Sequence, residues 1–216
     1  MKKFAVLLAG CGVYDGAEIH EATLTLLSIV QQGGTYQVFA PDINQHHVIN
    51  HITGTEMPEK RNVLVESARI ARGQISPLKN FKASDFDALI FPGGFGVAKN
   101  LCDFAFKGAD CGIHDEVAKA IKEMHASKKH IGALCISPVL LSKVLGKVEL
   151  TIGEDKDTIT SIEKMGSKHI KTTHGEVIHD EDHNIFTTPC YMLDANILQI
   201  YEGTTNIVKA IMASMK

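Results

Sequence analysis

The chain has 216 residues, 44% hydrophobic and 22% charged, which is the composition of a globular protein. Its 22 basic and 25 acidic residues are well mixed and leave a net charge of −3, so no basic patch indicates binding to nucleic acid or an anionic membrane. The longest apolar run, residues 4–9, is too short to cross a bilayer, and no cleavable signal precedes it. We therefore expect one domain over residues 1–216, located in the cytoplasm and acting on a small molecule.

Five cysteines at irregular spacing, without a Cys-x-x-Cys pair, argue against a disulfide framework, a ribbon-type zinc site and a thioredoxin-like couple. An odd number of free thiols suits a reducing compartment, which agrees with a cytoplasmic location.

The first elements read as strand, helix and strand. Residues 4–10 form a continuous apolar stretch that ends in glycine, as a strand buried on both faces does. Apolar residues then recur at three- and four-residue steps over residues 19–30, which predicts a helix, and residues 36–40 predict a second strand. The next segment, residues 41–85, is irregular, with a turn at 50–54 and a helix near 61–72.

The second half repeats the alternation. Its expected strands and helices are the strand 88–91, the helix 113–124, the strand 131–135, the helix 137–145, the strands 148–152 and 169–172, a hairpin over 176–188, and a mostly helical segment from 193. Strands that alternate with helices predict an α/β fold with a doubly wound, mostly parallel sheet sandwiched between helices.

Cys135 ends an apolar strand and is followed at once by the start of a helix. The carboxyl edge of a parallel sheet is where ligands bind, and a helix N-terminus favours the thiolate by lowering the pKa of the thiol. Most free cysteines are small buried hydrophobes, but this position predicts a nucleophile. The N–H groups of Gly93 and Gly94, which end another strand, and of Ile136 are candidates for binding an oxyanion or the substrate.

Two carboxylates open the first helix at the same edge of the sheet. Glu18 is explained by the preference of acidic residues for first turns, whereas Glu21 lies beside the apolar stripe. A partly buried carboxyl has a raised pKa and can transfer protons near neutrality. We therefore predict Glu21 as the acid–base group, with Glu18 and His20 as possible accessory residues.

Several motifs, in order along the chain, carry a family resemblance. They are Gly10-Cys-Gly-Val-Tyr-Asp-Gly16, Gly16-Ala-Glu-Ile-His-Glu21, Asn50-His-Ile-Thr-Gly54, Arg61-Asn-Val-Leu64, Pro92-Gly-Gly-Phe-Gly-Val-Ala-Lys-Asn-Leu101, Ala133-Leu-Cys-Ile-Ser-Pro138 and Thr187-Thr-Pro189. This pattern resembles the ThiJ/PfpI branch of the class I glutamine amidotransferase-like superfamily, and within it the ElbB group of glyoxalase-like proteins. The similarity extends over most of the chain.

The resemblance implies a flavodoxin-like fold, a nucleophile at Cys135 and a helix-borne carboxylate at Glu21. It also implies modest glyoxalase activity on a small aldehyde or dicarbonyl substrate without metal, glutathione or another cofactor, and a homodimer. One departure is that protease-like members often place a histidine directly after the cysteine, where this chain has Ile136.

Two other enzyme classes remain as alternatives. A glutaminase needs a His-x-Glu pair, and His174-Gly-Glu176 occurs only 39 residues after Cys135. A dinucleotide-binding enzyme is suggested by Gly10-x-Gly12-x-x-x-Gly16 and by Asp42 at the end of the second strand. The acidic residues at that helix start would repel a pyrophosphate.

The remaining alternatives are a metal site and a redox sensor. Loop histidines at 46, 47 and 51, and a charged hairpin tip at 179–183, contain metal-ligating residue types, but solvated loops explain both, and we predict no metal. An accessible thiol of low pKa at Cys135 would also suit a non-catalytic redox or stress sensor.

Overall fold

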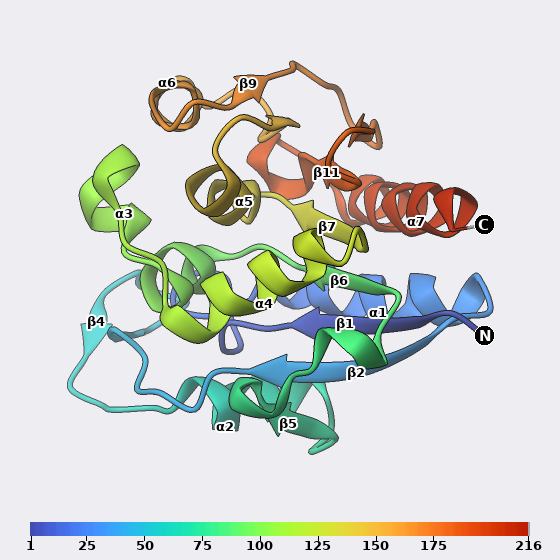
Figure 1. The fold of residues 1–216 in the computed structure, drawn as a ribbon. Helices are drawn as coiled ribbons and strands as arrows, with labels where there is room; N and C mark the ends of the chain where they lie inside the picture. Colours follow the sequence, from blue (N-terminus) through green and yellow to red (C-terminus); the bar gives the residue numbers. More distant parts are fainter. Residues whose placement is uncertain (216) are drawn as a thin grey trace.

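The computed structural model of the protein describes residues 1–215 and is built around a seven-stranded sheet (Figure 1). In spatial order, the strands are β10 (Ile178–Asp180), β11 (Ile185–Thr188), β7 (His130–Leu134), β6 (Ala88–Phe91), β1 (Lys3–Leu7), β2 (Thr35–Ala40) and β5 (Ile75–Pro77). All neighbouring pairs are parallel except β10 and β11, which form an antiparallel hairpin. This arrangement confirms the predicted doubly wound, mostly parallel sheet.

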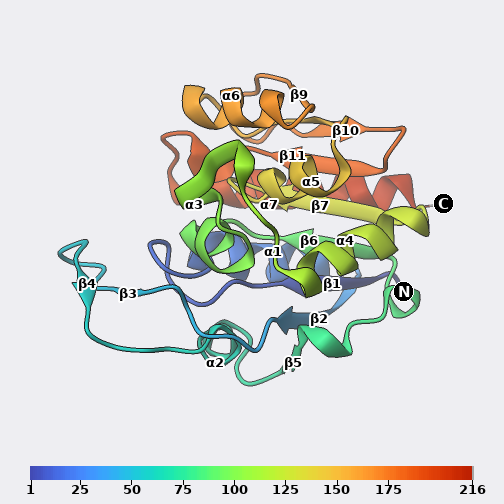
Figure 2. The ribbon, with the colours of Figure 1, turned by 60° about the vertical axis from the view of Figure 1, so that its left-hand side comes forward.

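Helices cover both faces of this sheet (Figures 1 and 2). They are α1 (Ile19–Gln31), α2 (Val63–Ile70), α3 (Phe104–Lys107), α4 (Asp115–Ala126), α5 (Pro138–Leu145), α6 (Lys156–Lys164) and α7 (Ile197–Ser214). The apolar faces of α4 and α5 bury one side of the sheet, and those of α1 and α7 bury the other.

The side chains of β1 show why its sequence is apolar without interruption. Successive strand residues point to opposite faces, so Phe4 and Val6 pack in the core beside α1 and α7, whereas Ala5 and Leu7 pack in the core beside α4 and α5. All four side chains are fully buried. A parallel strand covered by helices on both sides must be apolar at every position.

Some elements differ from the sequence expectations. The strands expected at 148–152 and 169–172 exist only as β8 (Glu149–Leu150) and β9 (Lys168–His169), which form a separate two-stranded sheet. The irregular segment 41–85 holds another two-stranded sheet, the antiparallel hairpin of β3 (Val48–Ile49) and β4 (Glu56–Met57). This hairpin extends from the body of the molecule (Figure 2). Strand β5 and helix α6 were not expected, because β5 has only three residues and α6 is mostly polar.

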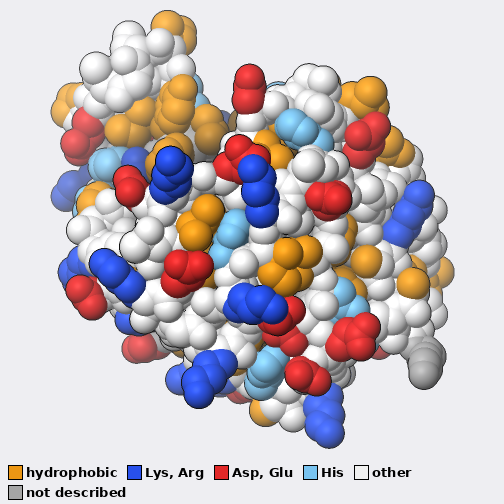
Figure 3. Space-filling view, turned by 90° about the horizontal axis from the view of Figure 1, so that it is seen from above, with side chains coloured by type: hydrophobic (Ala, Val, Ile, Leu, Met, Phe, Trp, Pro, Cys, Tyr) orange, Lys and Arg blue, Asp and Glu red, His pale blue; other side chains and the backbone are white. Residues whose placement is uncertain are grey.

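The surface agrees with the mixed charge pattern of the sequence. Figure 3, which views the molecule from the side of α6 and β9, shows acidic and basic side chains interspersed rather than separated by sign. Within residues 1–215, every helix is too short or too polar to cross a lipid bilayer.

Gly96 provides a test of the close packing that positions the loop after β6. Its N–H donates to the Gly16 carbonyl at 2.8 Å, and a Cβ at Gly96 would lie 2.5 Å from both Ala9 O and Gly16 Cα. Gly96→Ala should therefore lower the free energy of unfolding by about 1–3 kcal/mol. Gly112→Ala is the control, because its Cβ meets nothing nearer than 4.0 Å. Equal urea midpoints for the two variants would contradict this prediction.

Candidate functional site

Cys135 lies in the turn between β7 and α5, as the sequence predicts. Its backbone has φ = 59°, a left-handed conformation that costs a non-glycine residue roughly 1–3 kcal/mol. Two hydrogen bonds hold the turn: Cys135 N–H donates to Thr188 O at 3.0 Å, and Ser137 Oγ donates to Pro92 O at 2.8 Å. The neighbouring strands therefore fix the strained turn that carries the thiol.

Glu21 lies on the first turns of α1 and is fully buried. Its carboxyl oxygens accept hydrogen bonds from two backbone N–H groups, Oε2 from Gly93 at 2.8 Å and Oε1 from Tyr191 at 3.2 Å. Burial, followed by the charge of Glu18, raises the pKa of Glu21 to about 7, although both N–H groups act in the opposite direction. The sequence predicts partial burial of Glu21, and the structure buries it completely, with the pKa raised in the expected direction.

Gly93 allows the thiol and this carboxyl group to meet. A Cβ at Gly93 would lie 2.7 Å from Glu21 Oε2 and 2.9 Å from Cys135 Sγ, and it would overlap Cys135 Cβ. Cys135 and Glu21 consequently interact directly through their side chains. Because the Gly93 N–H is already bound by Glu21, Gly93 does not offer the free oxyanion donor that we expect from the sequence.

The pKa of Cys135 differs from the sequence expectation. Burial, and then the negative charge of Glu21, raise the pKa of the thiol well above its ordinary value, while the N–H groups of Gly94 and Ile136 lower it. The expectation of a low pKa is therefore wrong, because burial of the thiol, the larger cause, outweighs the N–H groups of the helix start. When Glu21 is protonated, its charge no longer opposes the thiolate, so the two side chains compete for one proton.

The two accessory candidates lie at the edge of the site. Glu18 is 8% exposed, and its carboxylate caps α1 by accepting the Glu21 N–H at 2.7 Å. His20 is exposed, and its Nδ1 lies 2.8 Å from the hydroxyl group of Tyr191. Tyr191 is a residue that sequence reasoning missed. It is 170 positions from Glu21, and no local pattern marks it.

A cavity of about 430 Å³ opens over Cys135. Its walls come from the loops after β1, β6 and β7, from α3, from the start of α6 and from the segment around Tyr191. The lining residues are Val13, Glu18, Gly94, Phe95, Ala98, Phe104, Ala105, Cys135, Ile136, Asp155, Thr158, Tyr191 and Met192. A concave, mostly apolar cavity with a few polar groups is the usual form of a small-molecule site.

The alternative sites do not gather around Cys135. His174 Nε2 lies 3.0 Å from the backbone oxygen of Asp194, and Glu176 binds the Thr173 N–H, so this pair is used in a loop of its own. Asp42 Oδ1 accepts a hydrogen bond from the side chain of Asn62. In the described part of the chain, the His, Cys, Asp and Glu side chains form no group of three or more suited to a metal.

The fold and site define a class: an α/β protein with a cysteine in a left-handed strand-to-helix turn, paired with a buried glutamate. No protein-family model matches the chain. It is 44% identical over 220 residues to the human mitochondrial glutamine amidotransferase-like class 1 domain-containing protein 3, across 97% of this chain and 82% of that protein. It is 34% identical to the zebrafish mitochondrial ES1 protein, across 96% and 84%. The chain belongs to this glutamine amidotransferase-like class 1 family.

Solved structures agree with this assignment. A protein from Ehrlichia chaffeensis, described as an isoprenoid biosynthesis protein with an amidotransferase-like domain, is 36% identical, with a TM-score of 0.92 over 99% of this chain and 100% of that one. A ThiJ/PfpI domain protein from Brachyspira murdochii shares the fold, with a TM-score of 0.61 at 12% identity over 100% of this chain and 98% of that one. The resemblance to ThiJ/PfpI proteins is therefore confirmed for the fold.

The cytoplasmic location expected from the sequence is contradicted by these comparisons. The human protein, the ES1 protein homolog of Rattus norvegicus and the zebrafish protein are all named as mitochondrial. The expectation was based on composition, reduced cysteines and the absence of a signal sequence, and none of these distinguishes one reducing compartment from another.

The raised pKa of Glu21 predicts how stability changes with pH. Because the folded-state pKa lies near 7 and the ordinary value is 4.5, the unfolded chain loses this proton first as the pH rises. The stabilisation that protonated Glu21 gives to the folded state is complete below about pH 4.5 and is lost as the pH rises to about 7. From pH 4.5 to 8, wild type should therefore lose about 3 kcal/mol of unfolding free energy relative to Glu21→Gln. Urea unfolding at both pH values tests this, and a difference that does not change with pH would contradict it.

Proposed function

We propose that the protein is a cofactor-independent glyoxalase-like enzyme that converts glyoxal and related 2-oxoaldehydes, such as methylglyoxal, into 2-hydroxy acids. The observation that carries the proposal is the direct pairing of the Cys135 thiol with a fully buried Glu21 whose pKa is about 7. A nucleophile beside a proton carrier of near-neutral pKa suits addition to an aldehyde followed by proton transfer. The resemblance of the sequence motifs to the ElbB group of glyoxalase-like proteins also supports the proposal.

The first step forms a carbon–sulfur bond. Glu21 takes the thiol proton as the sulfur of Cys135 adds to the aldehyde carbon, and the carbonyl π electrons move to oxygen. Glu21 then gives that proton to the oxygen, which completes the hemithioacetal and leaves Glu21 ionised again. The N–H groups of Gly94 and Ile136, which already stabilise negative charge on the sulfur, are available to stabilise the developing oxyanion.

The second step is an internal oxidation and reduction. Glu21 removes the proton from the former aldehyde carbon and returns it to the neighbouring carbon, while the hydroxyl proton of the hemithioacetal moves to the neighbouring oxygen. The first carbon is thereby oxidised to a thioester, and the second is reduced to an alcohol. Water then hydrolyses the thioester, which releases the 2-hydroxy acid and restores the thiol. The reaction balances without an external oxidant or reductant.

A redox sensor is a weaker proposal. Oxidation by peroxide proceeds through the thiolate, and Cys135 is 7% exposed with a raised pKa. Both properties disfavour a sensor. The glutaminase alternative has no support from the position of His174.

Substitution of the carboxyl groups tests the proposed roles. Glu21→Gln should lower kcat for glyoxal by roughly 100- to 10,000-fold, because it removes the group that carries the proton. Glu18→Gln should cost less than about tenfold, since an amide oxygen can still cap α1. Product formation followed by NMR would measure both. If Glu18→Gln were inactive and Glu21→Gln active, the roles would be reversed.

The pH profile tests the shared proton. The reactive enzyme holds one proton on the pair of Cys135 and Glu21, so acidification below about pH 7 adds a second proton and blocks addition. We expect kcat/KM to rise with pH through about 7 and to stay high while the thiol remains protonated. Glu21→Gln should lose this acid limb in its residual activity. A wild-type profile that is flat between pH 5 and 8 would contradict the assignment.

A further inference from the structure

The cavity over Cys135 is much larger than glyoxal. At a liquid volume of about 30 Å³ per water, about 430 Å³ corresponds to roughly fourteen waters. A two-carbon dialdehyde bound to the sulfur fills only a small part of this space. The remaining space is suited to a larger group attached to the carbonyl carbons.

The walls that surround this extra space are mostly apolar. Phe104 comes from α3, Phe95 and Ala98 from the segment after β6, and Val13 and Met192 from the loops on either side. Aliphatic and aromatic walls favour binding of an apolar ligand, because the apolar surfaces of both the wall and the ligand are removed from water. The shape and lining therefore favour a hydrocarbon substituent.

The charged side chains of the cavity are acidic. Glu18 caps α1, and Asp155 caps α6 by accepting the Thr158 N–H at 2.8 Å and its hydroxyl at 2.6 Å. Among the described lining residues, none is a lysine, arginine or histidine. A carboxylate or phosphate in this cavity would lose its water, find no cation and face two acidic groups.

Two basic side chains contact residues of the cavity wall, but each is held by another group. Lys99 lies over the Phe95 ring, with Nζ 5.1 Å from the ring centre, and donates to the Tyr14 carbonyl at 2.9 Å. His20 bonds to the Tyr191 hydroxyl.

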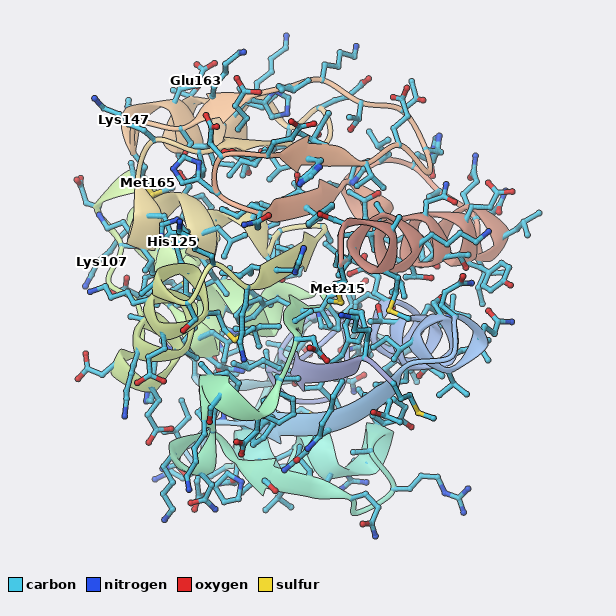
Figure 4. The ribbon with its side chains drawn as sticks, turned by 45° about the vertical axis from the view of Figure 1, so that its right-hand side comes forward. Lys107, His125, Lys147, Glu163, Met165 and Met215 are labelled. Carbon is cyan, nitrogen blue, oxygen red and sulfur yellow. The ribbon has the colours of Figure 1, made fainter. Side chains whose placement is uncertain are left out.

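A different hollow offers positive charge. Its volume is about 590 Å³, and its lining holds three lysines, Lys107, Lys143 and Lys164, against one acidic residue, Asp110, together with Met165. Figure 4 shows Lys107 and Met165 on the same side of the molecule. This hollow shares no lining residue with the cavity over Cys135, so its positive charge does not serve the thiol.

We infer that the preferred substrate is an uncharged 2-oxoaldehyde whose ketone carries an apolar group of about the size of a phenyl ring. The inference rests on the proposed function for the reacting end of the substrate. It adds that the rest of the cavity binds the apolar group attached to the ketone. It also excludes substrates with a carboxylate, such as glutamine, from efficient use.

A series of matched substrates tests this assignment. Phenylglyoxal should be converted with a kcat/KM roughly 10- to 100-fold above that of glyoxal, the range expected for burying a group of this size. 4-Carboxyphenylglyoxal should lose most of that gain. A preference for glyoxal, or equal rates for the neutral and carboxylated compounds, would overturn the inference and leave the proposed function intact.

Two variants test whether the cavity over Cys135 causes this substrate preference. Ala105→Phe fills the cavity from α3 and should lower the ratio of phenylglyoxal to glyoxal kcat/KM by about tenfold or more. Asp155→Asn keeps the oxygen that caps α6 and should raise the relative rate for the carboxylated substrate. Phe106→Ala is the control, because Phe106 is 51% exposed on the same helix and does not line the cavity. A shift in the control equal to that in Ala105→Phe would contradict the assignment.

A binding measurement separates this inference from the proposed function. Alkylation of Cys135 by iodoacetamide, followed by peptide mass spectrometry, should be slowed by 4-methylbenzaldehyde at concentrations where 4-carboxybenzaldehyde has little effect. If no 2-oxoaldehyde is converted, the proposed function fails, and this protection experiment alone decides whether the cavity prefers neutral apolar groups. Equal protection by both aldehydes would overturn the preference.

Discussion

The buried carboxyl group of Glu21 is the constraint on which the site depends. Its two oxygens bind the N–H groups of Gly93 and Tyr191, which join α1, the loop after β6 and the segment after β11 at one point beside Cys135. A carboxyl group without exposure is costly to ionise unless it is well hydrogen-bonded, so these contacts are as much a condition of stability as of chemistry. The same burial places its pKa near neutrality, which connects the fold to the proposed proton transfer.

Much of the fold and the centre of the site could be predicted from the sequence, because they depend on local patterns. Uninterrupted apolar runs predicted β1, β6 and β7, and a cysteine followed directly by a helix start predicted the turn at Cys135. The burial of Glu21 was readable from its place beside the apolar stripe of α1. Strand β5 and helix α6 were not readable, since one is three residues long and the other is mostly polar, and their positions are set by packing against the rest of the chain.

The errors at the site have one cause, which is contact between residues distant in sequence. A helix N-terminus suggests a low pKa for Cys135, but burial of the thiol, and then the charge of Glu21, 114 positions away, act in the opposite direction. The Gly93 N–H looks free until Glu21 is placed beside it, and Tyr191 has no local signature at all. The prediction of a cytoplasmic location was wrong for a different reason. Composition indicates that a chain folds into a globular core, but it does not indicate the compartment in which the protein is located.

The two outer strands of the sheet limit how copies of this chain can associate. Strand β5 has only three residues and ends in Pro77, which has no N–H to donate, and β10 is equally short. The carboxylate of Asp180, the last residue of β10, accepts a hydrogen bond from the backbone N–H of Glu149 in β8 at 2.8 Å. Short, capped edges of this kind discourage edge-to-edge pairing and aggregation through the sheet. The helical faces and the loops are left as the surfaces through which a stable oligomer would form.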